Sequence, residues 1–275
     1  MDEYEHGASG VDLRLDRAHS ARIYDYFLGG RTNFAADREA AAKVLGVFPA
    51  AQLAARVNRE FMHRATRALA RAGTRQWLDI GTGIPTSPNL HEVAQEVAPE
   101  ARAVYTDNDP IVLAHAAALL RSHPEGRTAY VQADVTDPAA VLSAPELLGT
   151  LDLSRPVVLS LNALLHFVDD ERGGGAHAVV EHFKRALPPG SVLAVTHATA
   201  DFAPEALAEV TAIYRAAGTP VRLRDRAEFA RFFDGWELLE PGITLSHRWR
   251  PDDPRDVAAV SAAEASCYAA VARKP

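Results

Sequence analysis

The sequence predicts an α/β fold, in which a doubly wound, mostly parallel sheet has helices on both faces and additional helices at the N-terminus. Two observations predict it. From residue 76 onwards, short apolar runs alternate with helical patterns, and each run is apolar throughout rather than at every second position. Strands buried on both faces have this pattern and form parallel sheets covered by helices. In addition, a polar residue follows nearly every run, at the edge where such sheets bind ligands.

Helical patterns dominate the first quarter of the chain. Residues 1–19 are mostly polar, and we expect a flexible N-terminus there. Helical patterns follow at 21–28, 34–46 and 50–72, and glycines stand after the first and the last. Apolar residues recur every four positions in the last pattern, which predicts one buried face: Leu53, Val57, Phe61, Ala65 and Leu69. We expect residues 20–73 to form a helical cap on a core at 74–275, within a single domain.

The core is predicted to contain a seven-stranded sheet. Its expected strands are 76–80, 103–106, 129–133, 157–161, 191–196, 236–239 and 267–273. Its expected helices are 89–97, 111–122, a short one starting at Ser143, 175–186, 205–217 and 226–233. A loop rich in Pro and Asp is expected at 251–256.

Composition excludes several classes of protein. The chain has 275 residues, 48% of them hydrophobic, and a formal charge of -7, which argues against a sequence-independent nucleic-acid binder. Its single cysteine, Cys267, excludes an internal disulfide framework and a cysteine-based zinc site, and no His-Glu-x-x-His pattern occurs. Apolar stretches stay below the ~18 residues of a membrane span. We therefore expect a cytoplasmic protein without a bound metal.

A glycine turn follows the first strand. Asp79, Gly81 and Gly83 stand where a strand meets a turn, and glycines allow a tight bend close to a ligand. A dinucleotide site would normally have a third glycine, but Ile84 and Pro85 follow here. The acidic Asp79 also suits a ligand that carries positive charge and no phosphate. The alternative is a strand-to-helix turn that needs glycine for its conformation alone.

Two further strands end in acidic residues. Asp107 could accept hydrogen bonds from both hydroxyls of a ribose. Asp109, followed by Pro110, is a typical helix cap, so we assign capping to Asp109 and the ribose to Asp107. Asp134 could accept from an adenine amino group or could cap the turn that follows it. Three acids at successive strand ends favour a common adenosine site.

These segments resemble those of class I S-adenosylmethionine (SAM)-dependent methyltransferases, and more specifically the actinobacterial S-adenosyl methyltransferase family. The resemblance spans residues 18–275. The segments that carry it are ARIYDYFLGG at 21–30, LDIGTG at 78–83, VYTDNDP at 104–110, LLHF at 164–167 and PGS at 189–191. It implies a Rossmann-like fold with SAM as cofactor.

The resemblance also implies roles for residues. Asp79, Gly81 and Gly83 would line the methionine end of SAM, Asp107 and Asn108 would hold the ribose, and Asp134 and Val135 would meet the adenine. Asn162 and His166 would close the site. In the N-terminal cap, Tyr24, Arg31 and Asn33 surround Gly29 and Gly30, and they would contact the cofactor or the acceptor. The alternative is that these three residues pack, pair or face solvent.

His166 and His197 are the candidate general bases, because an imidazole titrates near pH 6.5 and both follow strand ends. Many methyl transfers need no base, since positioning can suffice. We expect methyl transfer to a nitrogen, oxygen or sulfur atom of a small molecule, with a homodimer as the assembly and no nucleic-acid or membrane partner. The alternatives are a non-catalytic SAM-binding regulator and an NAD(P)-dependent oxidoreductase.

Overall fold

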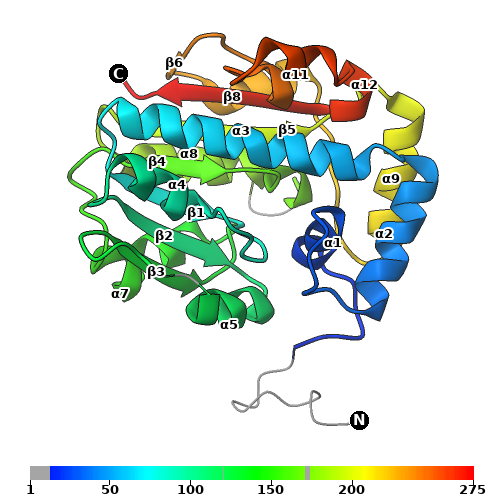
Figure 1. The fold of residues 1–275 in the computed structure, drawn as a ribbon, viewed down its shortest axis with the longest axis horizontal. Helices are drawn as coiled ribbons and strands as arrows, with labels where there is room; N and C mark the ends of the chain where they lie inside the picture. Colours follow the sequence, from blue (N-terminus) through cyan, green and yellow to red (C-terminus); the bar gives the residue numbers. More distant parts are fainter. Residues whose placement is uncertain (1–12, 120, 171–173) are drawn as a thin grey trace.

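An eight-stranded sheet forms the centre of the structure, a computed structural model that describes residues 13–119, 121–170 and 174–275 (Figure 1). The strand order is β3-β2-β1-β4-β5-β8-β6, and β7 also pairs with β8. The first five strands run parallel: β1 (Gln76–Ile80), β2 (Arg102–Asp107), β3 (Arg127–Gln132), β4 (Val158–Leu161) and β5 (Val192–Ala198). The others are antiparallel to their neighbours: β6 (Glu237–Leu238), β7 (Thr244–Leu245) and β8 (Cys267–Arg273).

The predicted fold class is confirmed: the chain has a Rossmann-like, doubly wound and mostly parallel sheet. All seven predicted strands are present with small shifts of their ends. The additional strand, β7, has two residues, which is too short for any periodicity to reveal.

Helices cover both faces of the sheet. On one face lie α3 (Ala51–Arg71) and α4 (Leu90–Val97), whose apolar residues pack with Trp77 of β1. Residues of α8 (Gly175–Ala186) and of the turn Arg231–Phe233 pack on the other face with Leu78, the next residue of β1. Neighbouring residues of one strand thus reach opposite layers, as a sheet buried on both sides requires.

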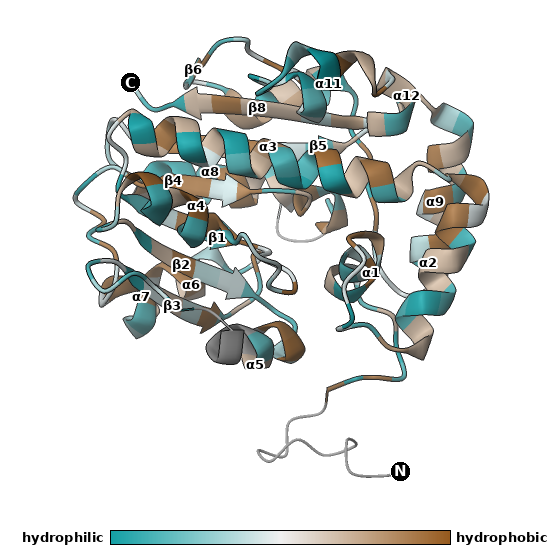
Figure 2. Cartoon of the chain, viewed as in Figure 1, coloured by the Kyte–Doolittle hydropathy of each residue, from teal (hydrophilic) through white to brown (hydrophobic). Residues whose placement is uncertain are grey.

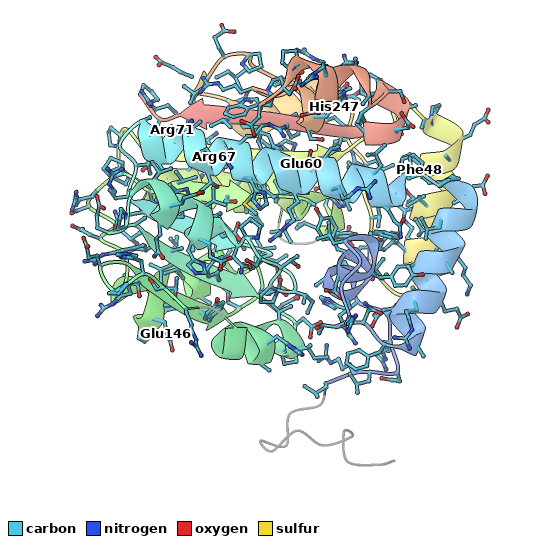
Figure 3. The ribbon with its side chains drawn as sticks, viewed as in Figure 1. Phe48, Glu60, Arg67, Arg71, Glu146 and His247 are labelled. Carbon is cyan, nitrogen blue, oxygen red and sulfur yellow. The ribbon has the colours of Figure 1, made fainter. Side chains whose placement is uncertain are left out.

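The long helix α3 shows how the predicted pattern is used. Val57, Phe61, Ala65 and Leu69 are buried, and Leu53 is partly buried, so the four-residue spacing does mark the inner face. Hydrophobic and hydrophilic residues alternate along its ribbon (Figure 2). Side chains of this helix that are not fully buried include Glu60, Arg67 and Arg71 (Figure 3).

A second group of helices stands beyond the carboxyl ends of the parallel strands (Figure 1). It consists of α1 (Ser20–Phe27), α2 (Ala35–Val47) and α9 (Pro204–Ala216). Helices α2 and α9 pack together, although they lie far apart in sequence, and share an apolar cluster that includes Phe27, Val44 and Tyr214. This cluster forms one wall of the space above the strand ends.

The N-terminal segment differs in part from the flexible one that we expected for residues 1–19. Residues 1–12 lie outside the described part of the chain. From residue 13 onwards the chain packs, because Leu13 and Leu15 contact the cluster of Ile84, Ile111 and Val112.

The remaining helices connect strands or follow them: α5 (Pro110–Leu119), α6 (Pro138–Ser143), α7 (Pro145–Leu148), α10 (Arg226–Ala230), α11 (Pro254–Ala258) and α12 (Ala262–Ala265). Ser143 ends a helix rather than starting one, because Asp137 caps the start of α6 and Pro145 begins the next. The predicted loop at 251–256 contains the start of α11, capped by Asp253. No single helix of the described residues has the length and apolarity to cross a membrane; α2 and α3 together pass on length and composition, with a bend of 102° between them.

Candidate functional site

One cavity of about 250 Å³ lies between the carboxyl ends of the strands and the helices α1, α2 and α9. Residues that follow β1, β2, β3 and β4 line one end of it, the three helices line the other, and α3 runs along the side. Of the sequence-predicted site residues, the structure brings nine to this cavity: Tyr24, Asp79, Gly81, Gly83, Asp107, Asn108, Val135, Asn162 and His166. It places four outside the lining: Arg31, Asn33, Asp134 and His197.

Asp107, the last residue of β2, has both carboxylate oxygens fixed by backbone donors. The Gly83 amide donates to Oδ2 at 2.9 Å, and the Asp109 amide donates to Oδ1 at 3.0 Å. Burial raises the pKa of this carboxyl, and the two amides act against that rise. Each oxygen keeps a lone pair for a further donor, so Asp107 is oriented to accept hydrogen bonds from hydroxyl groups in the cavity.

Asp79 lies in β1, next to β2, and faces the same cavity. Burial raises its pKa to about 6, although the hydroxyls of Ser160 and Thr82 and the charge of Arg59 favour the carboxylate. Ser160 in turn accepts a hydrogen bond from the Asn162 amide at 2.7 Å. A buried carboxylate with a raised pKa gains from any cation that enters the cavity.

The two glycines of the turn serve different purposes. Gly81 has a φ of +70°, and a Cβ there would lie 2.6 Å from the Leu164 side chain, so the packing of the loop excludes a larger residue. Gly83 has a φ of +68° and no atom within 4 Å of the position of a Cβ. The space above Gly83 is therefore open to a ligand that approaches the backbone closely.

The adenine side of the expected site contains Ala133 and Val135 in the cavity lining. Asp134 lies between them but outside the lining. Its Oδ1 accepts from the amide and the hydroxyl of Thr136 at 2.8 and 2.7 Å, and its Oδ2 accepts from Asn108 at 3.1 Å. Of the two roles considered for Asp134, these contacts favour capping of the following turn.

The two histidines proposed as bases lie in surroundings that disfavour a protonated ring. Burial lowers the pKa of His166 to about 3, and burial lowers that of His197 far below its usual value. The Nδ1 of His197 donates to the Ala198 carbonyl at 2.7 Å, and its Nε2 accepts from Arg224 at 2.9 Å. Both ring nitrogens of His197 are thus committed to the fold, which argues against a role as base.

The polar residues of the N-terminal cap mainly hold its helices together. The Tyr24 hydroxyl donates to the Ala55 carbonyl at 2.9 Å and accepts from Asn58 at 2.8 Å, while its ring lines the cavity. Asn33 is buried and donates to Asp25 at 2.8 Å. Arg31 is exposed. Asn33 therefore has a packing role rather than a place in the site. Tyr24 both holds the helices together and lines the cavity.

A buried ion-pair cluster fastens this cap to the strand ends. The Arg22 Nε lies 3.1 Å from the Asp109 carboxylate, and Asp37 lies 3.7 Å from the same guanidinium. His19 approaches Asp109 at 3.3 Å. Arg22 and Asp109 are each 2% exposed, and the other oxygen of Asp109 caps α5 by accepting from the Ile111 amide. Asp109 therefore fills the predicted capping role and also anchors α1.

Arg59 is a lining residue that the sequence did not reveal. It projects from α3, donates to the carbonyls of Thr86 and Pro88, and adds a positive charge close to Asp79. The helix carries several other arginines, at 56, 64, 67 and 71, so its pattern alone does not distinguish Arg59 from a solvent-facing residue. Its place over the glycine turn is visible only once α3 is packed on the sheet.

With this geometry in place, comparisons with known proteins identify the class. A family model described as S-adenosyl methyltransferase matches residues 6–275. The chain therefore belongs to the S-adenosyl methyltransferase family, and SAM is its cofactor.

Two solved structures of actinobacterial proteins are very similar. A DUF574 family protein from Streptomyces avermitilis is 52% identical, with a TM-score of 0.92 over 96% of this chain and 100% of that one. A candidate methyltransferase from Thermobifida fusca is 39% identical, with a TM-score of 0.88 over 95% of this chain and 97% of that one. An O-methyltransferase family protein from Burkholderia thailandensis, 15% identical, has a TM-score of 0.52 over 95% of this chain and 65% of that one, and shares the fold alone. No protein with a curated function matches the chain in sequence.

Proposed function

We propose that this protein transfers the methyl group of SAM to a nitrogen, oxygen or sulfur atom of a small molecule by in-line displacement and releases S-adenosylhomocysteine. The observation that carries the proposal is the convergence of Asp79 and Asp107, from neighbouring strands, on one cavity beside the open backbone of Gly83. Bound SAM supplies a methyl group already activated by a sulfonium, so the protein's task is mainly to bind and orient.

Each strand-end residue fits one part of the cofactor. Asp107 would accept hydrogen bonds from the ribose hydroxyls, because backbone amides already orient its two carboxylate oxygens. Asp79 and Asn162 would accept hydrogen bonds from the ammonium of the methionine end. The Oδ1 of Asn162 is buried and has no partner among the described residues. Arg59 would attract the carboxylate of the same end. Ala133 and Val135 would pack against the adenine.

The two alternatives are less well supported. Asp79, which faces the cavity beside the glycine turn, would repel the phosphates of NAD(P), and the turn lacks the third glycine of a dinucleotide site. A non-catalytic SAM sensor would use the same strand-end contacts. It would have no need of the apolar end of the cavity, which an acceptor molecule would occupy. Since neither His166 nor His197 is suited to take up a proton, we propose a transfer that relies on positioning, in which the proton released by the methylated atom passes to water. A homodimer stays a prediction, which light scattering can check.

Calorimetry tests the binding part of the proposal. SAM and S-adenosylhomocysteine should bind, and NAD and NADP should not. Asp107→Ala should weaken binding by about tenfold to a hundredfold, the cost of losing hydrogen bonds to a charged group. The control is Asp252→Ala, which removes an exposed carboxylate just before α11, outside the cavity lining. This variant should bind SAM as tightly as the wild type. Tight NAD binding without SAM binding would refute the proposal.

Turnover separates an enzyme from a sensor. Formation of S-adenosylhomocysteine should depend on an added acceptor from a panel of small molecules and should be lost in Asp107→Ala at low cofactor concentration. Binding of SAM with no turnover on any acceptor class, including the apolar compounds described below, would favour the sensor.

A further inference from the structure

The helical end of the cavity is almost wholly apolar. Ring and aliphatic side chains from α1, α2, α9 and the segment after α9 line it: Phe27, Val44, Phe48, Leu207, Val210, Val221 and Leu223. Figure 3 places Phe48 where α2 turns into α3. Such a surface binds ligands by removing apolar area from water.

Tyr214 of α9 adds one polar atom to this end. Its side chain is 9% exposed and lines the cavity, and its hydroxyl makes no hydrogen bond to any residue that the structure describes. Its ring packs at an angle of 46° on Phe167, with the ring centroids 5.5 Å apart. A ligand atom that accepts from this hydroxyl would gain a hydrogen bond on an otherwise apolar part of the lining.

His166 adds a second donor next to Phe167, and the two ring centroids lie 4.3 Å apart. The Ala198 amide donates to Nδ1 of His166 at 3.4 Å, so the neutral ring carries its proton on Nε2. His166 also lines the cavity, and its Nε2 has no partner among the described residues. Phe167 therefore packs against both side chains that carry a donor, Tyr214 and His166.

Charged side chains are confined to the opposite end. Of the described residues that line the cavity, the charged ones are Asp79, Asp107 and Arg59, with His19 beside Asp109. The first three face the expected cofactor. A ligand that carried a charge into the helical end would lose its hydration without gaining an ion pair, which is costly.

We propose that the helical end is the acceptor subsite and that it takes an uncharged, mostly aromatic molecule whose oxygen substituent accepts from the Tyr214 hydroxyl and the His166 ring. The inference rests on the proposed function, since the acceptor must lie beside the cofactor. It narrows the acceptor from any small nitrogen, oxygen or sulfur compound to neutral ring compounds that bear oxygen.

A set of ligands with one ring system and different charge tests the proposal: naphthol, naphthalene, naphthoate and naphthylmethylammonium. Binding to the full chain is measured at neutral pH in the presence of saturating S-adenosylhomocysteine, by fluorescence or ligand-observed NMR. Naphthol should bind most tightly, and the anion and the cation should each bind at least about tenfold more weakly, the result of burying an unpaired charge. Tighter binding of either charged compound would overturn the proposal.

Tyr214→Phe tests the hydrogen bond separately from the apolar wall. It should weaken naphthol binding about threefold to tenfold, the range for one neutral hydrogen bond, and leave naphthalene binding unchanged. The matched control is Tyr130→Phe, which removes a buried hydroxyl on β3 that has no partner among the described residues and lies outside this cavity. Equal losses for naphthol and naphthalene in Tyr214→Phe would contradict the assigned donor. The wild-type ligand series decides the question if the variant fails to fold.

Titration of the same protein samples with S-adenosylhomocysteine distinguishes failure of the proposed acceptor class from failure of the proposed function. If it binds and no naphthalene compound does, the acceptor class is wrong and the proposed function stands. If it does not bind, the proposed function fails. If naphthol binds but competes with S-adenosylhomocysteine, naphthol occupies the strand end, and the assigned subsite is wrong.

Discussion

The two ends of the cavity are built by opposite means. At the strand end, polar atoms are held by neighbours, as when backbone amides fix both oxygens of Asp107. At the helical end, apolar side chains from helices distant in sequence meet, and the Tyr214 hydroxyl has no partner within the described chain. The difference teaches that the charged part of the cavity is built on the sheet, while packing between helices far apart in sequence sets the size and polarity of its other end.

The largest effect on stability is expected at the buried ion-pair cluster of Arg22, Asp37 and Asp109, which connects α1 to the strand ends. Arg22→Met keeps the bulk of the side chain but leaves Asp109 and Asp37 buried without their shared cation. Removing one partner of a buried ion pair costs about 3–5 kcal/mol, so the free energy of unfolding should fall by that amount in urea titrations.

The control for this variant is Arg67→Met, which breaks an exposed pair with Asp252 and should change the free energy of unfolding by less than about 1 kcal/mol. Equal stability of the two variants would show that the cap is not held by Arg22.

Asp79 should make the strand end sensitive to pH. Because burial raises its pKa to about 6, the carboxyl becomes protonated as the pH falls through that value and no longer attracts an ammonium. Affinity for S-adenosylhomocysteine should therefore weaken below pH ~6, by up to about tenfold per pH unit. Asp79→Asn should bind weakly at pH 7 and show a smaller change down to pH ~5 than the wild type, the remaining change being due to Asp107, whose pKa burial also raises.

The same shift predicts the opposite effect on stability. A carboxyl whose folded pKa is raised stabilises the fold at pH values below its unfolded pKa and loses that contribution as the pH rises through about 6. At pH 7 the ligand-free Asp79→Asn protein should therefore be more stable than the wild type. Loss of both stability and affinity would indicate a structural role instead. Thermal unfolding with and without ligand measures both.

Gly83 gives the smallest effect on folding and a clear effect on binding. Gly83→Ala places a methyl group in open space at a positive φ, which costs about 1–2 kcal/mol of stability. The same methyl group would occupy space beside the proposed cofactor, so affinity for S-adenosylhomocysteine should fall as well.

Gly235→Ala is the matched control for Gly83→Ala. Gly235 also has a positive φ and open space around it, and it lies outside the cavity. This variant should lose similar stability in urea and keep its affinity. If both variants bind equally well, the cofactor does not approach Gly83.

Sequence reasoning predicted the sheet and the residues at the strand ends because both depend on local pattern. The apolar run 157–161, followed by Asn162, predicted a buried strand, and the structure has β4 at Val158–Leu161. Asp79 and Asp107 share a cavity because parallel strands end at one edge, which topology alone ensures.

What the sequence could not predict depends on contacts between distant segments. Arg59 has the same surroundings in sequence as the other arginines of α3, and only the packing of that helix brings it over the glycine turn. His166 and His197 stand at strand ends as a base would, but their burial, and the contact of His197 with Arg224, decide their protonation. The pairing of α2 with α9, which completes the apolar wall, likewise has no local signal.

Asp109 connects the strand end of the cavity with helix α1. Its amide orients Asp107, and its carboxylate holds Arg22 of α1. Any ligand that tightens the loop after β2 must, by reciprocity, be bound more strongly when the first helix is docked. Hydrogen exchange at the amides of residues 20–27 should thus slow when the cofactor binds.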